Sequence, residues 1–142
     1  MVSEAVAITH FEERHRPGSA SLIQRLPEWF GIEASNRACI AALGRLPTFV
    51  VESDSGVAAF MALEETSAEA AEIHIMAVAP QLHRRGIGRA MASHWEAWGR
   101  SRGLSILHVR TLAPSHPDPY YARTRAFYRA LGFLPVFETT AL

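Results

Sequence analysis

The sequence predicts an α+β fold in which a mixed, mostly antiparallel sheet of six to seven strands is flanked by about four helices. Short runs of apolar and β-branched residues, separated by turn signals, indicate the strands. Stretches with helical periodicity that end at glycine or proline indicate the helices. The 142 residues contain no internal repeat, linker or low-complexity tract, so residues 1–142 are expected to form a single domain.

The N-terminal part is expected to contain one strand and two helices. Residues 5–9 (AVAIT) have the composition of a strand. A helical pattern follows and is interrupted at Pro27, which cannot continue a helix interior. A second helix is expected over residues 33–43, because Gly44 directly after it can supply the left-handed residue that ends many helices.

The middle of the chain predicts an antiparallel meander of three strands. Two apolar runs, residues 48–52 and 57–64, are joined by residues 53–56, a turn whose glycine suits a hairpin. Residues 66–70 are small and polar and indicate a second turn. The third strand is expected over residues 71–78.

A helix and a parallel strand are expected next. Apolar residues from Ile87 onward are spaced by four, four and three, which is helical spacing. They are Ile87, Met91, Trp95 and Trp98. After this helix ends near Gly103, residues 104–112 indicate a fifth strand. Because a helix intervenes, this strand should run parallel to strand 71–78 through a right-handed crossover.

The C-terminal part is expected to contain a loop, a helix and a last strand. Residues 113–119 include three prolines and predict a loop. Residues 120–131 indicate a helix that Gly132 ends, and residues 133–139 indicate a sixth strand.

Composition excludes several classes of function. Hydrophobic content of 49% with 14 basic and 14 acidic residues gives no general attraction to nucleic acid or membranes. No apolar run approaches 18 residues, and no signal peptide is evident, so a cytoplasmic protein is expected. Cys39 is the single cysteine, which excludes an internal disulfide, and the histidines lack zinc-ligand spacing, so no metal site is expected.

The turn before the long helix predicts a site for a phosphate or diphosphate. A helix that begins at glycines exposes backbone N–H groups and the positive end of its dipole. Gly86 and Gly88 let an anion approach the main chain, and arginines on both sides add forked donors. The spacing fits neither a Walker loop nor a dinucleotide fingerprint, which would need a third glycine where Met91 stands.

This segment resembles the signature [RQ]-x-x-G-x-[GA] of the Gcn5-related N-acetyltransferases (GNAT). The match is residues 83–88 (HRRGIG), preceded by the strand phrase at residues 76–80 (MAVAP). His83 departs from the usual glutamine or arginine. A second similar phrase, residues 126–133 (AFYRALGF), matches the end of a family helix. Together the two motifs and the element order cover nearly the full chain.

The resemblance implies that acetyl-coenzyme A is the cosubstrate. In the family the glycine turn holds the diphosphate, and main-chain groups of the preceding strand bond the pantetheine amides. The residues expected to contact the cofactor are Met76, Ala77, Val78, Arg84, Arg85, Gly86, Ile87, Gly88 and Arg89. The family usually adds a seventh strand, but this chain stops at Leu142, soon after the sixth. The sheet is expected to end early or to borrow an edge from a partner, which favours a homodimer.

The resemblance also implies a mechanism in which an amine attacks the thioester directly and Tyr128 protonates the leaving thiolate. A phenol with a reference pKa of about 10 lies within about two units of a thiol at about 8.5, so this transfer is nearly thermoneutral. Glu72 is the first candidate for the base, because one branch of the family has a glutamate at the matching site. Another branch has its glutamate at the position of His108.

The identity of the base stays open among Glu72, His74, His108 and a water relay. Strand alternation is expected to place Glu72, His74 and Met76 on one face of the sheet. A carboxylate has a pKa of about 4.3 and an ammonium ion a pKa near 10.4, so proton transfer between them crosses some six pKa units and costs roughly 8 kcal/mol. Imidazole, with a pKa of about 6.5, is closer.

The sequence therefore predicts an acetyltransferase that acts on a primary amine of a small molecule or peptide. No motif identifies the acceptor. The alternative is a catalytically silent module that binds or senses coenzyme A on the same scaffold.

Overall fold

The computed structural model describes residues 6–83, 85–111, 114–115 and 118–139. The chain forms two compact units, Met1–Val109 and Arg110–Leu142. The elements in chain order are β1 (Thr9–His10), a 3-10 turn (Glu13–His15), α1 (Arg16–Gln24), α2 (Glu33–Ala42), β2 (Thr48–Ser53), β3 (Gly56–Glu65), β4 (Ala70–Val78), a second 3-10 turn (Pro80–Leu82), α3 (Ile87–Ser101), β5 (Ile106–Val109) and α4 (Pro119–Ala130).

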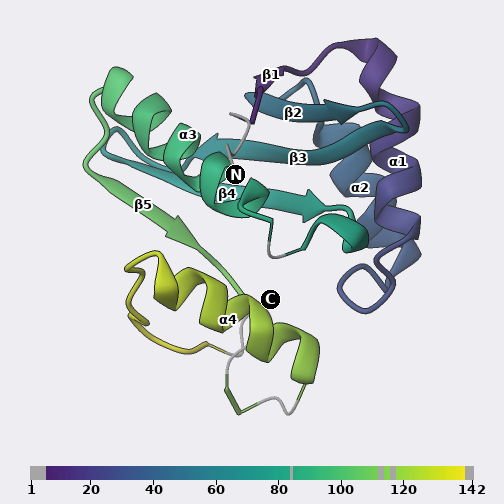
Figure 1. Cartoon of the computed structure of the whole chain (residues 1–142). Helices are drawn as coiled ribbons and strands as arrows, with labels where there is room; N and C mark the ends of the chain where they lie inside the picture. Colours follow the sequence, from purple (N-terminus) through teal and green to yellow (C-terminus); the bar gives the residue numbers. More distant parts are fainter. Residues whose placement is uncertain (1–5, 84, 112–113, 116–117, 140–142) are drawn as a thin grey trace, which may run out of the picture. The chain divides into compact units, whose positions relative to one another are not determined.

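The first unit is built on a five-stranded sheet in the order β1-β2-β3-β4-β5 (Figure 1). The pairs from β1 to β4 are antiparallel, and β5 runs parallel to β4. The predicted meander and the parallel fifth strand are therefore confirmed. The α+β class, with a mixed sheet and four helices, is confirmed as well.

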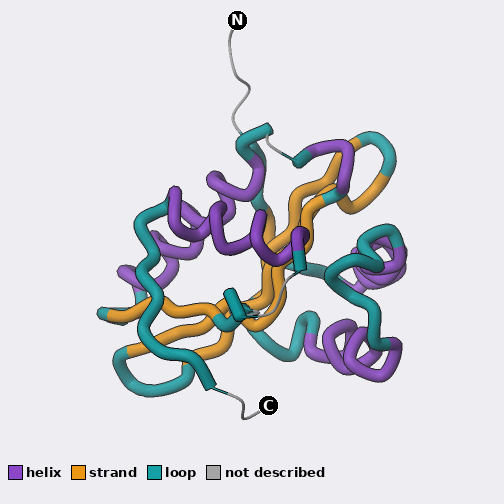
Figure 2. The backbone as a smooth tube through the Cα atoms, turned by 90° about the horizontal axis from the view of Figure 1, so that it is seen from below, coloured by secondary structure: helices purple, strands orange, loops and turns teal. Residues whose placement is uncertain are grey.

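The number of strands is smaller than the sequence predicts. Residues 133–139 are all described and contain no strand, and Figure 2 draws them as loop. Leu134, Val136 and Phe137 are 73%, 87% and 80% exposed, so no buried face stabilises a strand here. Pro135 also lacks the N–H that a ladder requires.

Two predicted strands are shorter than expected. Of the predicted strand 5–9 only Thr9 lies in β1, which is Thr9–His10, and the fifth strand is limited to Ile106–Val109; positions 5 and 112 lie outside the described residues. Composition predicted longer strands. Both β1 and β5 are outer strands of the sheet, however, and pairing with a single neighbour sets their length. The predicted helices agree with α1 to α4 to within a few residues.

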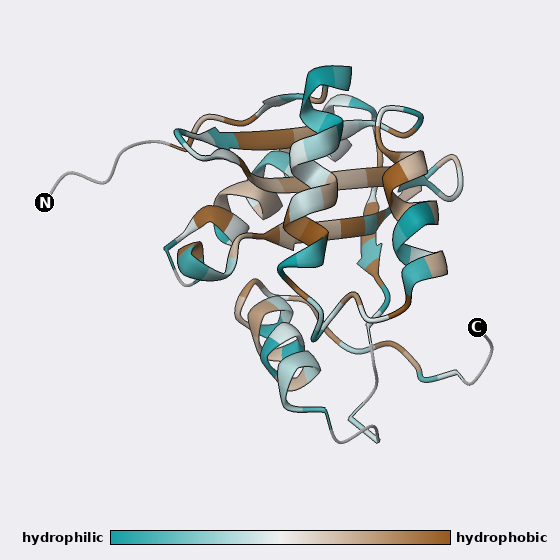
Figure 3. Cartoon of the chain, turned by 90° about the vertical axis from the view of Figure 1, so that its right-hand side faces the viewer, coloured by the Kyte–Doolittle hydropathy of each residue, from teal (hydrophilic) through white to brown (hydrophobic). Residues whose placement is uncertain are grey.

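The sheet of the first unit is covered on both faces. Leu22 and Leu26 of the α1 region pack in one apolar cluster with alternate strand residues, including Phe60, Ala62 and Ile75. Figure 3 shows brown, hydrophobic stretches along these strands. The remaining strand positions face α3, whose periodic residues Met91 and Trp95 are fully buried, as the spacing predicts.

The helix of the second unit has a well-defined start and end. The Asp118 carboxylate accepts hydrogen bonds from the N–H groups of Tyr120 (2.8 Å) and Tyr121 (3.2 Å), which caps α4. Gly132 follows the helix with φ 95°, the left-handed residue expected at its end. In the described part of the chain, no helix has the length and apolar content needed to cross a membrane.

Candidate active site

The turn before α3 has the geometry of an anion site. Gly86 is the N-cap residue and adopts φ 82°, ψ 0°, a left-handed conformation that favours glycine. The first helical hydrogen bond runs from the Ala90 N–H to the Gly86 carbonyl, at 3.0 Å. The N–H groups of residues 87–89 therefore have no acceptor within the helix, and they lie at the positive end of its dipole.

Two of the three predicted arginines can be placed beside this turn. Arg85 and Arg89 are exposed, and within the residues that the structure describes neither guanidinium has an acidic partner. Arg84 lies outside the described residues. The cationic side chains and the N–H groups are thus both available to an anion, and the predicted diphosphate contacts stay a prediction.

Replacing Gly86 with alanine is expected to weaken acetyl-coenzyme A binding about tenfold and to lower the free energy of unfolding by about 1–2 kcal/mol. A methyl group at Gly86 would meet no atom within 4 Å, so the cost comes from the left-handed backbone alone. Calorimetric titration and denaturant unfolding measure the two effects.

Gly103 at the other end of α3 provides the matched control. It has φ 73° and equally open surroundings, so Gly103→Ala should cost similar stability and leave cofactor affinity unchanged. Equal affinity losses in the two variants would show that the effect is general destabilisation, not the geometry of the anion turn.

The parallel strands β4 and β5 separate next to this turn. Among the described residues they pair only from Ala70 and Ile106 to Ile73 and Val109, while β4 continues to Val78. Figure 1 shows the two strands diverging from that point. The outer edge of β4 over residues 74–78 is therefore not paired with β5.

The main-chain groups of β4 that face this opening can be assigned. The Ala79 N–H donates to the Ala58 carbonyl at 2.8 Å, so Ala79 faces β3. Because antiparallel neighbours alternate, the polar groups of Val78 and Met76 point away from β3, into the opening. Ala77, between them, is 3% exposed and directs its main chain toward β3.

His83, which departs from the family motif, ties the anion turn to this edge. Its Nε2 lies 2.8 Å from the Val78 carbonyl oxygen, which accepts the hydrogen bond. Its ring also contacts Trp29 edge to face, with the ring centroids 5.7 Å apart. Sequence reasoning missed this contact, because a histidine in a basic turn carries no signal of its partner.

A bulge in β4 changes which side chains share a face. Ile73 pairs with Leu63 and Ile75 pairs with Ala62, so His74 is an extra residue between them. Beyond the bulge the alternation reverses, and Ile75 and Ala77 join the core on the α1 side. The prediction that Met76 shares a face with Glu72 is therefore wrong.

Three polar residues form a row across the sheet instead. Glu64 of β3 lies opposite Glu72 of β4, which lies opposite His108 of β5. Glu64 is spaced by two residues from Ala62 and by four from Phe60 along β3, so it shares their face of the strand. This row therefore lies on the α1 side of the sheet. Glu72 is 4% exposed and is the one buried carboxylate among the described residues.

The structure brings two of the three candidate bases together. Glu72 Oε2 lies 3.6 Å from His108 Nδ1, an ion-pair distance if the ring is protonated. His74 is separate from them and lies with its Nδ1 3.8 Å from Glu64 Oε2. His108 Nε2 is 2.7 Å from the hydroxyl of Thr66, a residue that sequence reasoning treated only as part of a turn.

The candidate acid lies in the second unit, near the end of α4. The Tyr128 ring is half-buried and contacts Phe127 and Phe133, with centroids 5.2 Å and 5.4 Å away. Desolvation raises the pKa of Tyr128 to about 12. The phenol therefore stays protonated near neutral pH, as an acid must, but its pKa is further from that of a thiol than the sequence suggested.

This raised pKa predicts a pH dependence of stability. The unfolded chain loses the Tyr128 proton near pH 10, whereas the folded chain keeps it until the pKa of about 12. The folded state thus binds more protons in that window, so stability should fall as the pH rises from about 10 to 12. Burial and the Asp118 carboxylate also raise the pKa of Tyr121. Ultraviolet titration of phenolate should therefore show late titration that Tyr128→Phe reduces; an unchanged late phase would contradict the assignment.

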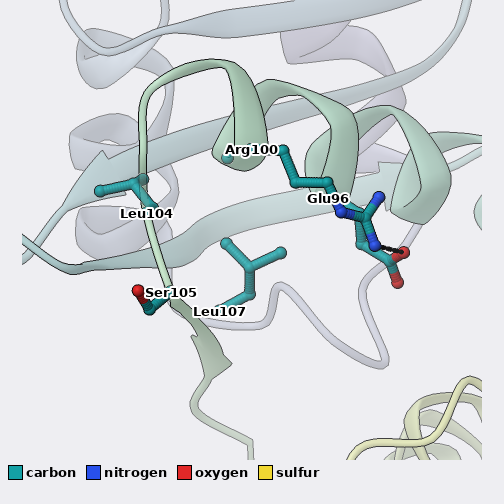
Figure 4. A pocket seen from close by; sticks show the side chains of 6 residues that line it. Glu96, Arg100, Leu104, Ser105 and Leu107 are labelled. Carbon is teal, nitrogen blue, oxygen red and sulfur yellow. Dashed lines mark ion pairs between the residues drawn. The ribbon is translucent and has the colours of Figure 1, made fainter.

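Two surface cavities lie apart from these residues. The smaller, of about 130 Å³, is lined by the end of α3 and the start of β5, with Leu104, Leu107 and the Arg100–Glu96 ion pair (Figure 4). The larger, of about 530 Å³, is a groove between α1 and α2. Within the described residues, no cluster of three or more histidine, cysteine or acidic side chains could hold a metal ion.

The mixed sheet, the splayed parallel pair and the glycine turn at a helix start define the class of acetyltransferase folds. The family model described as "Acetyltransferase (GNAT) domain" matches residues 45–135. The chain belongs to the GNAT family, as its two motifs indicated. No curated protein sequence matches it.

Several solved structures share the fold. The ribosomal-protein-S18-alanine N-acetyltransferase from Escherichia coli is 23% identical, with 94% of this chain and 80% of that chain covered and a TM-score of 0.73. AAC(6')-Iy in complex with a coenzyme A bisubstrate analogue is 16% identical, with 98% and 97% covered and a TM-score of 0.73. Ard1 from Thermoplasma volcanium is 16% identical, with 94% and 86% covered and a TM-score of 0.74.

Proposed function

We propose that this protein transfers an acetyl group from acetyl-coenzyme A to a primary amine by direct attack, without an acyl-enzyme intermediate. The observation that carries the proposal is the juxtaposition of the Gly86 turn with the unpaired edge of β4. The turn offers N–H groups to a diphosphate, and the edge offers amide partners to a pantetheine arm, all within the first unit.

Acetyl-coenzyme A is the cosubstrate. The expectation from the sequence is confirmed by membership of the acetyltransferase family and by relatives solved with coenzyme A or its analogue. The turn at residues 85–89 would hold its diphosphate through main-chain N–H groups and the two guanidinium groups.

In this proposal Tyr128 protonates the departing thiolate, and Glu72 takes part in removing the amine's proton. The buried Glu72, with Glu64 opposite it, gives this face of the sheet a negative charge. Such a face suits an acceptor that arrives as an ammonium ion. The acceptor is a small-molecule or peptide amine, and the homodimer and the cytoplasmic location stay predictions.

Release of free coenzyme A across an amine panel tests the proposal. The panel contains spermidine, an aminoglycoside such as kanamycin, free amino acids and a peptide with N-terminal alanine, each compared with a reaction without amine. At least one amine should accelerate release and appear acetylated by mass spectrometry. Tight acetyl-coenzyme A binding with no turnover for any amine would favour the silent coenzyme A-binding module.

A further inference from the structure

Three side chains from separate segments meet at the row of polar residues on the α1 side of the sheet. Thr66 comes from the turn between β3 and β4, Glu72 from β4 and His108 from β5. The parallel register that places His108 beside Glu72 also brings Thr66, 42 positions away in sequence, to His108. Thus both ring nitrogens of one histidine face oxygen atoms.

The chemistry of these oxygens orients the proton on the ring. An ionised carboxylate only accepts, so Glu72 Oε2, 3.6 Å from Nδ1, favours hydrogen on Nδ1 by its charge, at a distance too long for a hydrogen bond. In that tautomer Nε2 accepts a hydrogen bond from the Thr66 hydroxyl across 2.7 Å. Exposure to solvent increases from Glu72 to Thr66: the Glu72 side chain is 6% exposed, the His108 side chain is 38% exposed and Thr66 is exposed.

From this geometry we infer that Thr66, His108 and Glu72 form a proton relay for the acceptor amine, an inference that rests on the proposed function. The ammonium N–H passes its proton to Thr66 Oγ1 while the Thr66 O–H proton moves to His108 Nε2. The neutral amine then attacks the thioester carbonyl, the N–C bond forms and the C–S bond breaks, and the departing thiolate takes its proton from Tyr128. The second N–H proton is lost to solvent, from which Tyr128 is reprotonated, and the imidazolium is stabilised by the Glu72 carboxylate. His108 is the base, Thr66 contacts the acceptor, and Glu72 is a positioning residue.

The relay resolves the choice that the sequence left open. Imidazole is closer in basicity to an ammonium ion than a carboxylate is, so His108 is the better proton acceptor. Glu72 is too buried to meet the acceptor directly, but its charge faces the ring. Two further titratable groups lie near this row, Glu64, opposite Glu72, and His74, whose Nδ1 is 3.8 Å from Glu64 Oε2.

The first test measures acetylation of the best amine of the panel above. His108→Ala should lower kcat by about 10²-fold or more with acetyl-coenzyme A affinity unchanged, and added imidazole should restore part of it. The loss should shrink for a hydrazide acceptor, which is already neutral at the assay pH. A change within about threefold for the alkylamine would overturn the relay.

The second test separates the roles of the partners. Glu72→Gln should lower kcat about tenfold in the wild-type background and add nothing in the His108→Ala background, because Glu72 acts through the ring. Full additivity would make Glu72 an independent base and overturn the relay. Thr66→Val should lower kcat about tenfold, and Thr66→Ser should restore it; equal rates for the two variants would also overturn the relay.

Matched controls come from the same unit. His10→Ala removes an exposed histidine of β1, and Glu69→Gln neutralises an exposed carboxylate in the turn next to Thr66. Both should leave kcat unchanged. A wild-type protein that acetylates no amine would defeat the proposed function itself, whereas an active wild type with active His108→Ala would defeat the relay alone.

A third readout needs no activity. Nitrogen-15 spectra of the histidine rings, recorded where His108 is neutral, should show it as the Nδ1–H tautomer, with Glu72→Gln and Thr66→Val shifting the signal toward Nε2–H. A wild-type ring in the Nε2–H tautomer would overturn the assignment of Nε2 as the proton acceptor.

Discussion

Replacing Tyr128 with phenylalanine is expected to lower kcat by about 10²-fold or more and to leave the dissociation constant of acetyl-coenzyme A unchanged. The change removes only the phenol O–H, and the ring can keep its contacts with Phe127 and Phe133. Without that proton the thiolate must leave as an anion. Single-turnover kinetics and calorimetric titration separate the chemical step from binding.

The raised pKa of Tyr128 also affects the energy of proton transfer to the departing thiolate. The pKa of the Tyr128 phenol, about 12, is about 3.5 units above the pKa of a thiol, about 8.5. Full proton transfer from this phenol to a free thiolate is therefore uphill by about 5 kcal/mol. Because this transfer is uphill, it is expected to be coupled to the rate-limiting chemical step. A sizeable solvent isotope effect on kcat in wild type, lost in Tyr128→Phe, would show this coupling.

Tyr120 gives the control for this prediction. It lies on the same helix, and its ring is covered by the Arg123 guanidinium at 5.3 Å from the centroid. Tyr120→Phe should keep kcat within about threefold of wild type. Equal activity in Tyr128→Phe and Tyr120→Phe would remove Tyr128 from the mechanism and leave protonation of the thiolate to water.

Local signals predicted most of the fold. The spacing of Ile87, Met91 and Trp95 located α3, because an amphipathic helix needs only its own sequence to show which face is buried. The glycine of the β2–β3 turn likewise located a hairpin. The predicted strand bounds were wrong at β1, β5 and residues 133–139, because strand pairing depends on a neighbouring strand that composition does not reveal.

The candidate site also has features that the sequence could predict and features that it could not. The Gly86 turn could be found from sequence because both its parts, the glycines and the helix start, are adjacent in the chain. The bulge at His74 and the contact between Thr66 and His108 could not, since each depends on cross-strand register. The sequence therefore named Glu72, His74 and His108 as alternatives without showing that two of them form a pair.

Reversing the charge of both arginines at the anion turn is expected to weaken acetyl-coenzyme A binding by about 10²-fold or more. Each charge-assisted hydrogen bond to a phosphate contributes about 1.5–3 kcal/mol, and glutamates at positions 85 and 89 would add repulsion. Both side chains are exposed, so Arg85→Glu with Arg89→Glu should leave the fold intact. Calorimetric titration at several salt concentrations measures the affinity and its electrostatic part.

The salt dependence distinguishes contact from general attraction. Wild-type affinity should fall as salt rises, because guanidinium groups at the turn meet a charged diphosphate, and the slope should be smaller in the double variant. Arg37→Glu with Arg100→Glu makes the same change in net charge at exposed positions on α2 and α3. If that control loses as much affinity as the turn variant, the diphosphate is not held at residues 85–89, and the proposed contact of the pantetheine arm with the edge of β4 must be abandoned with it.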